Sequence, residues 1–180
     1  ILIDPLNVFN FWFRGLSHLY NGQYSLALAL FRKLLQTDPE NPAGHLYYAW
    51  ALACNGEIEE AICVIDKSGR AFPDNKFSKA GLLMKYVLLK DKENALREMT
   101  ADFQKTCRRD AANAHFIGVM LALLDEKNLA LDWLENAVNR GFINYPLLAE
   151  KDPFLQNIRG EERFQKLMER VKYEWEHFEV

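Results

Sequence analysis

The side chains of this sequence that could bind a metal or act as nucleophiles are its histidines and cysteines. They are His18, His45, His115, His177, Cys54, Cys63 and Cys107. No pair among them has the short spacing that is typical of zinc ligands, so we expect no metal site. An odd and sparse set of thiols also argues against a disulfide framework and favours a reducing environment. We expect these seven side chains to be packed or solvated.

Paired charges are the other candidates for a reactive site. Glu59-Glu60 and Asp125-Glu126 have the chemistry for acid–base catalysis, but both are expected at turns or on solvated helix faces. Arg108-Arg109 could contact an acidic partner, although two adjacent charges are common on any surface. The sequence has no glycine-rich phosphate loop and no supported Ser/His/Asp or Cys/His arrangement. We therefore expect no catalytic residue and no cofactor, and a protein that is not an enzyme.

The composition is that of an ordinary globular protein. The chain has 180 residues, of which 49% are hydrophobic and 26% charged, and its formal net charge is −3. Because there is no basic excess, we do not expect this chain to bind nucleic acid. No apolar run reaches the about 18 residues of a membrane-spanning helix, so we expect no membrane contact by this chain. The sparse, odd set of cysteines favours a reducing environment, and we expect a cytoplasmic location.

A period of 34 residues organises several residue types at once. The residues that repeat at this interval are Pro5, Pro39 and Pro73, Asn7, Asn41 and Asn75, Gly22 and Gly56, and Ala27, Ala61 and Ala95. Glycine suits the reversal between two helices, proline ends the second helix, and asparagine can cap the next one. Small alanines would let paired helices approach closely. The period thus predicts repeated helix–turn–helix units.

This pattern resembles the tetratricopeptide repeat, whose period is 34 residues. The first unit matches the repeat at Phe11, Gly15, Ala27, Phe31 and Pro39, and departs from it at Arg14 and His18. The second unit matches well, the third is weaker, and the fourth follows after one extra residue. The resemblance implies an all-α fold, namely a right-handed superhelical solenoid of antiparallel helix pairs with a C-terminal capping helix.

The resemblance also predicts the organisation of the chain. Residues 1–142 would be the repeat array, with the end of a truncated upstream repeat at 1–7 and repeats at 8–41, 42–75, 76–110 and 111–142. Helices are expected at 8–21, 24–37, 42–55, 58–71, 76–89, 92–106, 111–124 and 127–140. Because residues 4–7 resemble the end of a preceding unit, we expect a fragment of a longer protein. The alternative is a solenoid that begins here with an extended arm.

Residues 143–180 are expected to cap the array. A helix at about 160–178 carries one apolar stripe, made of Phe164, Leu167, Met168, Val171, Trp175 and Phe178. A terminal repeat must be capped, and this stripe suits that role.

The segment around Gly141-Phe142, Asp152-Pro153-Phe154, Ile158-Arg159 and Arg163-Phe164 resembles the closing segment of repeat regions in bacterial multidomain signalling proteins. In those proteins the N-terminal effector is a serine/threonine protein kinase, a winged-helix regulator or an adenylate cyclase. The last residues look most like the kinase group. No effector motif is present here, so the resemblance assigns no catalytic residue.

In a superhelix of this kind, the first helix of each unit lines the concave face. The expected partner-binding residues on that face are Phe9, Trp12, Phe13, Leu16, Tyr20, Leu46, Tyr47, Trp50, Met84 and Phe116. This set lacks the basic and amide residues that would clamp a peptide carboxylate, which favours an apolar helix or peptide as ligand. Tyr20, Tyr47 and Trp50 combine a large apolar body with a polar tip, as contact residues often do.

Two functions fit these observations. The first is a non-catalytic protein–protein interaction or scaffold module, the regulatory C-terminal region of a larger bacterial signalling protein, with a kinase as the main candidate. The alternative is a structural, autoinhibitory or dimerisation module whose groove is filled by its own chain, for example by the last helix. A homodimer through the exposed first helix is also open, and the aromatic residues could equally be plain core.

Overall fold

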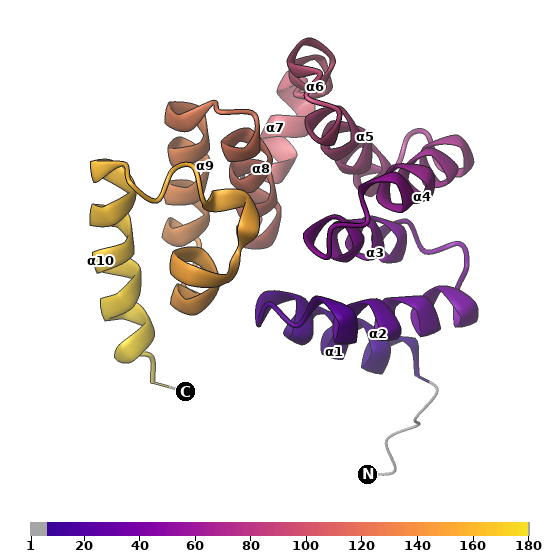
Figure 1. Cartoon of the computed structure of the whole chain (residues 1–180), viewed down its shortest axis with the longest axis horizontal. Helices are drawn as coiled ribbons and strands as arrows, with labels where there is room; N and C mark the ends of the chain where they lie inside the picture. The colour runs from indigo at the N-terminus through magenta and orange to yellow at the C-terminus, as the bar shows by residue number, and fades with distance from the viewer. Residues whose placement is uncertain (1–6, 180) are drawn as a thin grey trace. The chain divides into compact units, whose positions relative to one another are not determined.

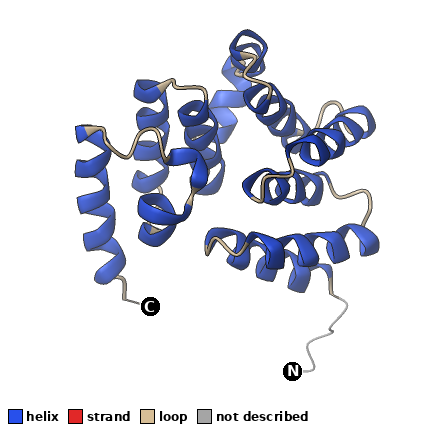
Figure 2. Ribbon diagram, in the orientation of Figure 1, coloured by secondary structure: helices blue, strands red, loops and turns tan. Residues whose placement is uncertain are grey.

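The structure is a computed structural model that describes residues 7–179. All regular secondary structure in these residues is helical, and none of them lies in a β-strand (Figure 2). This confirms the predicted all-α class. The chain divides into two compact units, Ile1–Leu88 and Leu89–Val180. The division falls inside the predicted third repeat. Apart from Asn7, the predicted end of an upstream repeat lies outside the described residues.

In the described part of the first unit, five helices lie side by side in chain order, drawn from indigo to magenta in Figure 1. They are α1 (Val8–Tyr20), α2 (Tyr24–Thr37), α3 (Pro42–Cys54), α4 (Ile58–Ala71) and α5 (Lys76–Leu88). Each begins at the predicted residue and ends within one residue of the predicted end. In addition to its neighbours in sequence, α3 packs against α1 and α5.

The predicted caps and turns account for these boundaries. The Asn41 side chain accepts a hydrogen bond from the backbone N–H of Gly44 at 2.8 Å, and that of Asn75 accepts one from Phe77 at 2.9 Å. Gly22 and Gly56 have φ values of 71° and 88°, the left-handed region in which glycine has no steric cost. The repeat pattern therefore encodes both ends of these helices.

Small residues bring the paired helices together, as predicted. Ala27, Ala61, Ala95 and Ala130 are all fully buried. A Cβ added at Gly15 of α1 would lie 2.7 Å from the Phe31 ring of α2, so this position has no room for a side chain.

The second unit contains shorter and less regular helices. They are α6 (Lys92–Glu98), α7 (Ala101–Cys107), α8 (Ala111–Leu123), α9 (Lys127–Asn139), the π-helical turn η1 (Leu147–Lys151), the 3₁₀ turn η2 (Pro153–Leu155) and α10 (Glu162–Glu176). Helix α8 packs against α7, α9 and η2, and α10 packs against α9. Among the residues described, no helix is long and apolar enough to cross a bilayer.

The prediction of one helix at 92–106 was wrong, because two short helices occupy this segment. Thr100 has an extended backbone, with φ −61° and ψ 155°, and its hydroxyl accepts a hydrogen bond from the Phe103 N–H. A threonine side chain that competes for backbone N–H groups favours a cap over a helix interior. Thr100 therefore starts a new helix where the repeat pattern would continue the old one.

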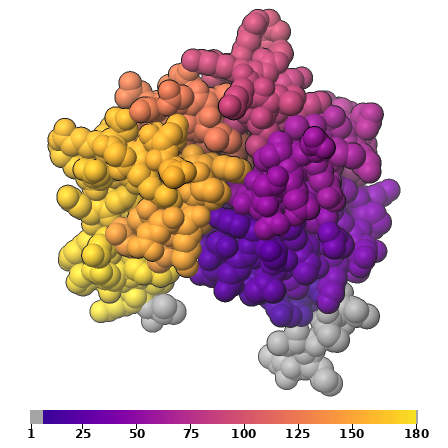
Figure 3. All heavy atoms as spheres, in the orientation of Figure 1, coloured from indigo at the N-terminus to yellow at the C-terminus, as the bar shows by residue number. Residues whose placement is uncertain are grey.

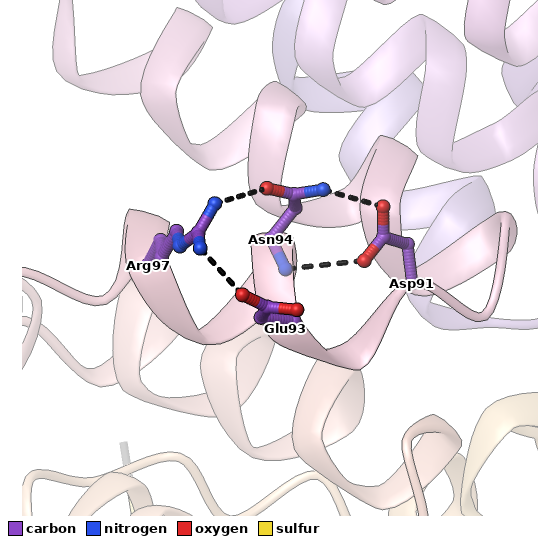
Figure 4. Close-up of polar contacts among 4 residues, drawn as sticks. All are labelled: Asp91, Glu93, Asn94 and Arg97. Carbon is purple, nitrogen blue, oxygen red and sulfur yellow. Dashed lines mark hydrogen bonds and ion pairs between the residues drawn. The ribbon is translucent and has the colours of Figure 1, made fainter.

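Side chains of α6 and its cap hold this short helix (Figure 4). Asp91 accepts hydrogen bonds from the backbone N–H of Asn94 at 3.1 Å and from its side-chain amide at 2.6 Å. The side-chain bond from Asn94 is the main reason that the pKa of Asp91 is lowered. Arg97 donates to Asn94 at 3.2 Å and pairs with Glu93 one turn back. A helix of seven residues thus has a capped start and a tethered last turn.

The last helix caps the second unit, and part of its predicted stripe is buried. Phe164, Leu167, Met168 and Val171 are buried, but Trp175 is 47% exposed and Phe178 is 66% exposed. The predicted helix end at about residue 178 was wrong, because α10 ends at Glu176, and the buried part of the stripe ends at Val171. Figure 3 shows the yellow atoms of this C-terminal segment at the surface.

Candidate protein-interaction surface

Helices α1 and α3 carry eight of the ten predicted partner-binding residues. Helix α1 holds Phe9, Trp12, Phe13, Leu16 and Tyr20, and α3 holds Leu46, Tyr47 and Trp50. Met84 lies on α5 of the same unit, and Phe116 lies on α8 of the second unit.

Five rings of the first unit form one cluster, which we call the aromatic cluster: Trp12, Tyr20, Phe31, Tyr47 and Trp50. Trp12 meets Tyr47 edge-on at a centroid distance of 5.0 Å, and Tyr47 stacks on Trp50 at 5.8 Å. Phe31 of α2 lies beneath, 6.3 Å from Trp12 and 6.2 Å from Tyr47. Tyr20 meets Trp50 at 6.4 Å. Each such pair adds about 1 kcal/mol beyond the area that it buries.

The ten predicted residues differ in exposure. Leu46, Tyr47, Trp50, Met84 and Phe116 are buried. Trp12, Leu16 and Tyr20 are half-buried. Phe9 and Phe13 are 68% and 64% exposed, and their rings stack on each other at 6.5 Å. The part of this set that a partner can reach directly is therefore the face of α1, and the binding role of all ten residues stays a prediction.

A pocket of about 310 Å³ opens at one end of this face. Its lining residues are Val8, Phe9 and Trp12 of α1, Leu34 of α2, Ala43 of α3, and Asp38 and Asn41 of the connecting loop. Phe9 and Trp12 were predicted on the binding face, whereas Asn41 was predicted only as a helix cap and Asp38 was given no binding role. Their closeness to α1 depends on how α2 and α3 pack, which no short motif reports.

In the second unit, two titratable side chains are buried together. The Nε2 atom of His115 lies 3.8 Å from a carboxylate oxygen of Asp152, and the His115 ring stacks on Phe142 at 4.1 Å. Burial lowers the pKa of His115 to about 3 and raises the pKa of Asp152 to about 6. Neither side chain is open to a substrate, since they are 0% and 3% exposed. This pair belongs to the packing of the cap.

The remaining candidates lie where the sequence analysis placed them. Glu59 and Glu60 occupy the exposed first turn of α4, and Asp125-Glu126 forms the turn before α9. The guanidinium of Arg108 lies 4.1 Å above the ring of Trp133. Within residues 7–179, no group of three or more His, Cys, Asp or Glu side chains could hold a metal ion.

A family model and one curated relative match parts of this chain. The family model of the tetratricopeptide repeat matches residues 18–80, from the end of α1 into α5. The TPR repeat-containing thioredoxin TTL4 of Arabidopsis thaliana is 31% identical over 112 residues, which is 62% of this chain. The chain spans only 16% of the length of that relative.

Two solved structures are similar to this chain at a low level. MamA from Desulfovibrio magneticus RS-1 aligns with a TM-score of 0.46 at 14% identity, over 92% of this chain and 95% of that one. A double mutant of MamA RS-1 aligns with a TM-score of 0.47 at 14% identity, over 95% and 97%. The family match and the helix pairs of the first unit agree with each other. Residues 18–80 therefore match the tetratricopeptide repeat, a helix-pair repeat that is typical of protein-binding surfaces.

Proposed function

We propose that this chain is a non-catalytic interaction or scaffold module that binds an apolar helix or segment of a partner on α1 and the aromatic cluster. The observation that carries the proposal is the exposure of Phe9 and Phe13 beside half-buried Trp12, Leu16 and Tyr20. Contiguous exposed apolar side chains mark interaction sites in proteins.

The buried members of the set support this surface from below. Tyr47 and Trp50 are only 7% and 2% exposed, so they hold the rings of Trp12 and Tyr20 in place while leaving part of each accessible. A rigid aromatic surface loses little side-chain entropy when a partner binds. Such a surface suits an amphipathic helix that presents large apolar side chains along one face.

We further propose that the module is the regulatory C-terminal region of a larger bacterial signalling protein, with a kinase as the main candidate. The resemblance of the closing segment to such repeat regions supports this assignment. The Arabidopsis relative is consistent with a repeat region that forms part of a longer protein. The odd number of cysteines supports a reducing location such as the cytoplasm.

The decisive experiment is site-specific photo-crosslinking in source cells. A photoreactive residue replaces Phe13 on the proposed surface or, as a control, Leu26 on α2, which is 52% exposed. A protein captured only from position 13 is then purified, and its affinity is measured by calorimetry.

The Phe9→Ser/Phe13→Ser double variant should bind that protein at least about tenfold more weakly, because two large apolar contacts are lost. Leu26→Ser should bind it like the unchanged chain. Equal capture from both positions, or equal affinity of both variants, would refute the proposal.

The alternative function is self-association or autoinhibition through the same face. The observation that favours it is the exposure of Phe9 and Phe13, since an exposed apolar surface also suits a second copy or another segment of the same protein. Analytical ultracentrifugation separates the two functions. A dimer that the Phe9→Ser/Phe13→Ser variant abolishes, with no captured partner, would favour the alternative.

A further inference from the structure

We propose that the pocket between α1, α2 and α3 is an anchor site that receives a bulky apolar side chain of a protein partner together with an adjacent lysine or arginine. This inference rests on the proposed interaction function and names the chemistry of the partner. Its evidence is the shape of the pocket, the acidic side chain of Asp38 in its lining, and a comparison with the next helix junction.

The pocket has an apolar floor and apolar walls. Leu34 is fully buried at its base and Ala43 is 9% exposed, whereas Phe9 and the half-buried Trp12 reach outward. A volume of about 310 Å³ is at the lower end of sites that hold a small ligand. An aromatic or branched aliphatic side chain would exchange water for these walls.

The polar side of the pocket is negative. Among the described residues of the lining, Asp38 is the only one with a charged side chain, and its carboxylate accepts a hydrogen bond from the Asn41 amide at 2.9 Å. Asp38 also terminates α2, whose last turn contains no basic residue. The negative end of the α2 dipole therefore has no cation in the last turn to balance it. Both this dipole and the Asp38 carboxylate favour a positively charged group of a partner. A neutral amide neighbour leaves the charge of Asp38 available to a partner.

The junction of the next repeat is a natural control within the same unit. It lies between α3, α4 and α5, and its cavity is lined by residues that include Leu46, Ser68 and Phe77. These three residues stand 34 positions after Trp12, Leu34 and Ala43 of the pocket. That cavity has no space for a water molecule.

Several equivalent positions differ between the open and the closed junction, and two of these differences concern the space and the charge of the pocket. The second residue of the helix is Phe9 in α1 and Phe77 in α5, but Ala43 in α3. The residue that ends the second helix is Asp38 after α2 and Phe72 after α4. A small residue thus opens the pocket and an acidic residue supplies its charge. Ala43 and Asp38 together favour a ligand that has a bulky apolar side chain next to a cation.

The test titrates N-acetyl-phenylalanyl-arginine amide into the isotope-labelled chain and follows backbone amide signals by NMR. The matched probe is N-acetyl-phenylalanyl-citrulline amide, which has nearly the same shape as the first probe without its charge. We expect saturable shifts at Val8, Asn41 and Ala43, and about threefold tighter binding of the arginine probe, as for a partly exposed ion pair.

Three variants assign this difference to the pocket. Asp38→Asn should remove the advantage of arginine over citrulline, whereas Glu40→Gln, which removes an exposed charge two residues away, should retain it. Ala43→Phe restores the residue type of the equivalent positions and should abolish binding of both probes by filling the pocket. Circular dichroism checks that each variant is folded.

Several results would overturn the proposal. They are the absence of saturable shifts up to roughly 10 mM probe, equal binding of both probes, or an arginine advantage that survives Asp38→Asn. Dimerisation that occupies the pocket in the free chain would also overturn it, since the occupant would then be a second copy. A crosslinked partner that depends on Phe9 and Phe13 but tolerates Asp38→Asn and Ala43→Phe would refute the anchor site while leaving the interaction function intact.

Discussion

Helices α1 and α8 occupy the same place in their predicted repeats, yet they have opposite surroundings. The sixth residue of each helix is a phenylalanine, Phe13 in α1 and Phe116 in α8. Phe13 is 64% exposed and Phe116 is 4% exposed. All residues from Ala114 to Ala122 are buried, because α7, α9 and the turn η2 all pack against α8 within the second unit. The same repeat position is therefore surface or core according to what covers it.

This difference separates the roles of the two units. The second unit completes its own core with a cap, and it can hold a polar pair such as His115 and Asp152 inside that core. The first unit leaves an aromatic face and a charged pocket at the surface. We infer that the first unit carries the partner-binding surface and that the buried face of α8 in the second unit serves the stability of the fold.

The largest expected effect comes from truncating the paired phenylalanines. Phe116→Ala should lower the free energy of unfolding by about 3–4 kcal/mol, as loss of a buried aromatic ring does. Phe13→Ala should cost less than about 1 kcal/mol because its ring remains mostly in water. Urea unfolding of the full chain, followed by fluorescence and circular dichroism, measures both. Similar costs would mean that the two helices are covered to the same extent.

The next effect is a pH dependence that comes from the buried pair in the second unit. The folded state lowers the pKa of His115 to about 3, so that between about pH 6.5 and 3 the unfolded state binds the extra proton and acid destabilises the fold. The folded state raises the pKa of Asp152 to about 6, so that between about pH 4 and 6 the folded state binds the extra proton and stability is lost as the pH rises. The two contributions oppose each other over the shared range.

Asp152→Asn should remove this compensation and keep the cap, because asparagine also accepts a hydrogen bond from the Phe154 N–H. Relative to the unchanged chain, the variant should lose roughly 1 kcal/mol of stability for each pH unit between 6 and 4. Urea unfolding at several pH values checks this slope. Parallel pH profiles of the two proteins would contradict the assignment.

A smaller effect concerns the attachment of α10. Arg163 donates to both carboxylate oxygens of Glu135 at 2.6 and 2.7 Å and to Asp132 at 2.7 Å. These hydrogen bonds raise the pKa of Arg163, and the side chain is 40% exposed. Arg163→Gln should therefore cost only about 1 kcal/mol and should speed hydrogen exchange in α10.

Lys166→Gln provides the control for Arg163, since its ion pair with Glu162 is exposed and lies within α10. This change should be close to neutral. Equal effects of the two substitutions would show that the contacts between α9 and α10 do not hold the cap.

The smallest effect is expected at the turns. Gly22 and Gly56 hold the left-handed turn position in the first unit, while Lys90 and Asp125 hold it in the second at φ 58° and 61°. Lys90→Gly should stabilise the chain by about 0.5–1 kcal/mol, because glycine removes the steric cost of that conformation. Gly56→Ala should destabilise it by a similar amount. Thermal unfolding compares both variants, and a loss of stability in Lys90→Gly would contradict this account.

The repeat pattern predicted most of the helices because caps, turns and close contacts depend on neighbouring residues. Asn41, Asn75, Gly22 and Gly56 act within a few positions of their own place in the chain, so their effect is readable in the sequence. The same pattern misled at Thr100, where one local cap interrupts a helix that the period would continue. The prediction failed at Thr100 because the local cap and the 34-residue period favour different structures there.

The candidate site was less predictable, because burial depends on helices that are distant in sequence. Phe9 and Phe13 were predicted to share one apolar face with Tyr47 and Trp50, but packing buries Tyr47 and Trp50 and leaves Phe9 and Phe13 exposed. Trp175 and Phe178 continue the stripe of Phe164 to Val171, yet they reach beyond the packed face. Apolar spacing shows which side chains share a face, not how far the neighbouring surface extends.

The sequence by itself determined the all-helical class, the 34-residue register and the ends of most helices, since these follow from backbone preferences and short-range hydrogen bonds. Only the tertiary structure decided which aromatic side chains reach solvent, that Asp38 meets an apolar pocket, and that His115 and Asp152 are buried together. These features need segments far apart in the chain to meet. Burial, and the pKa shifts that burial causes, depend on how these segments pack together and not on any single segment.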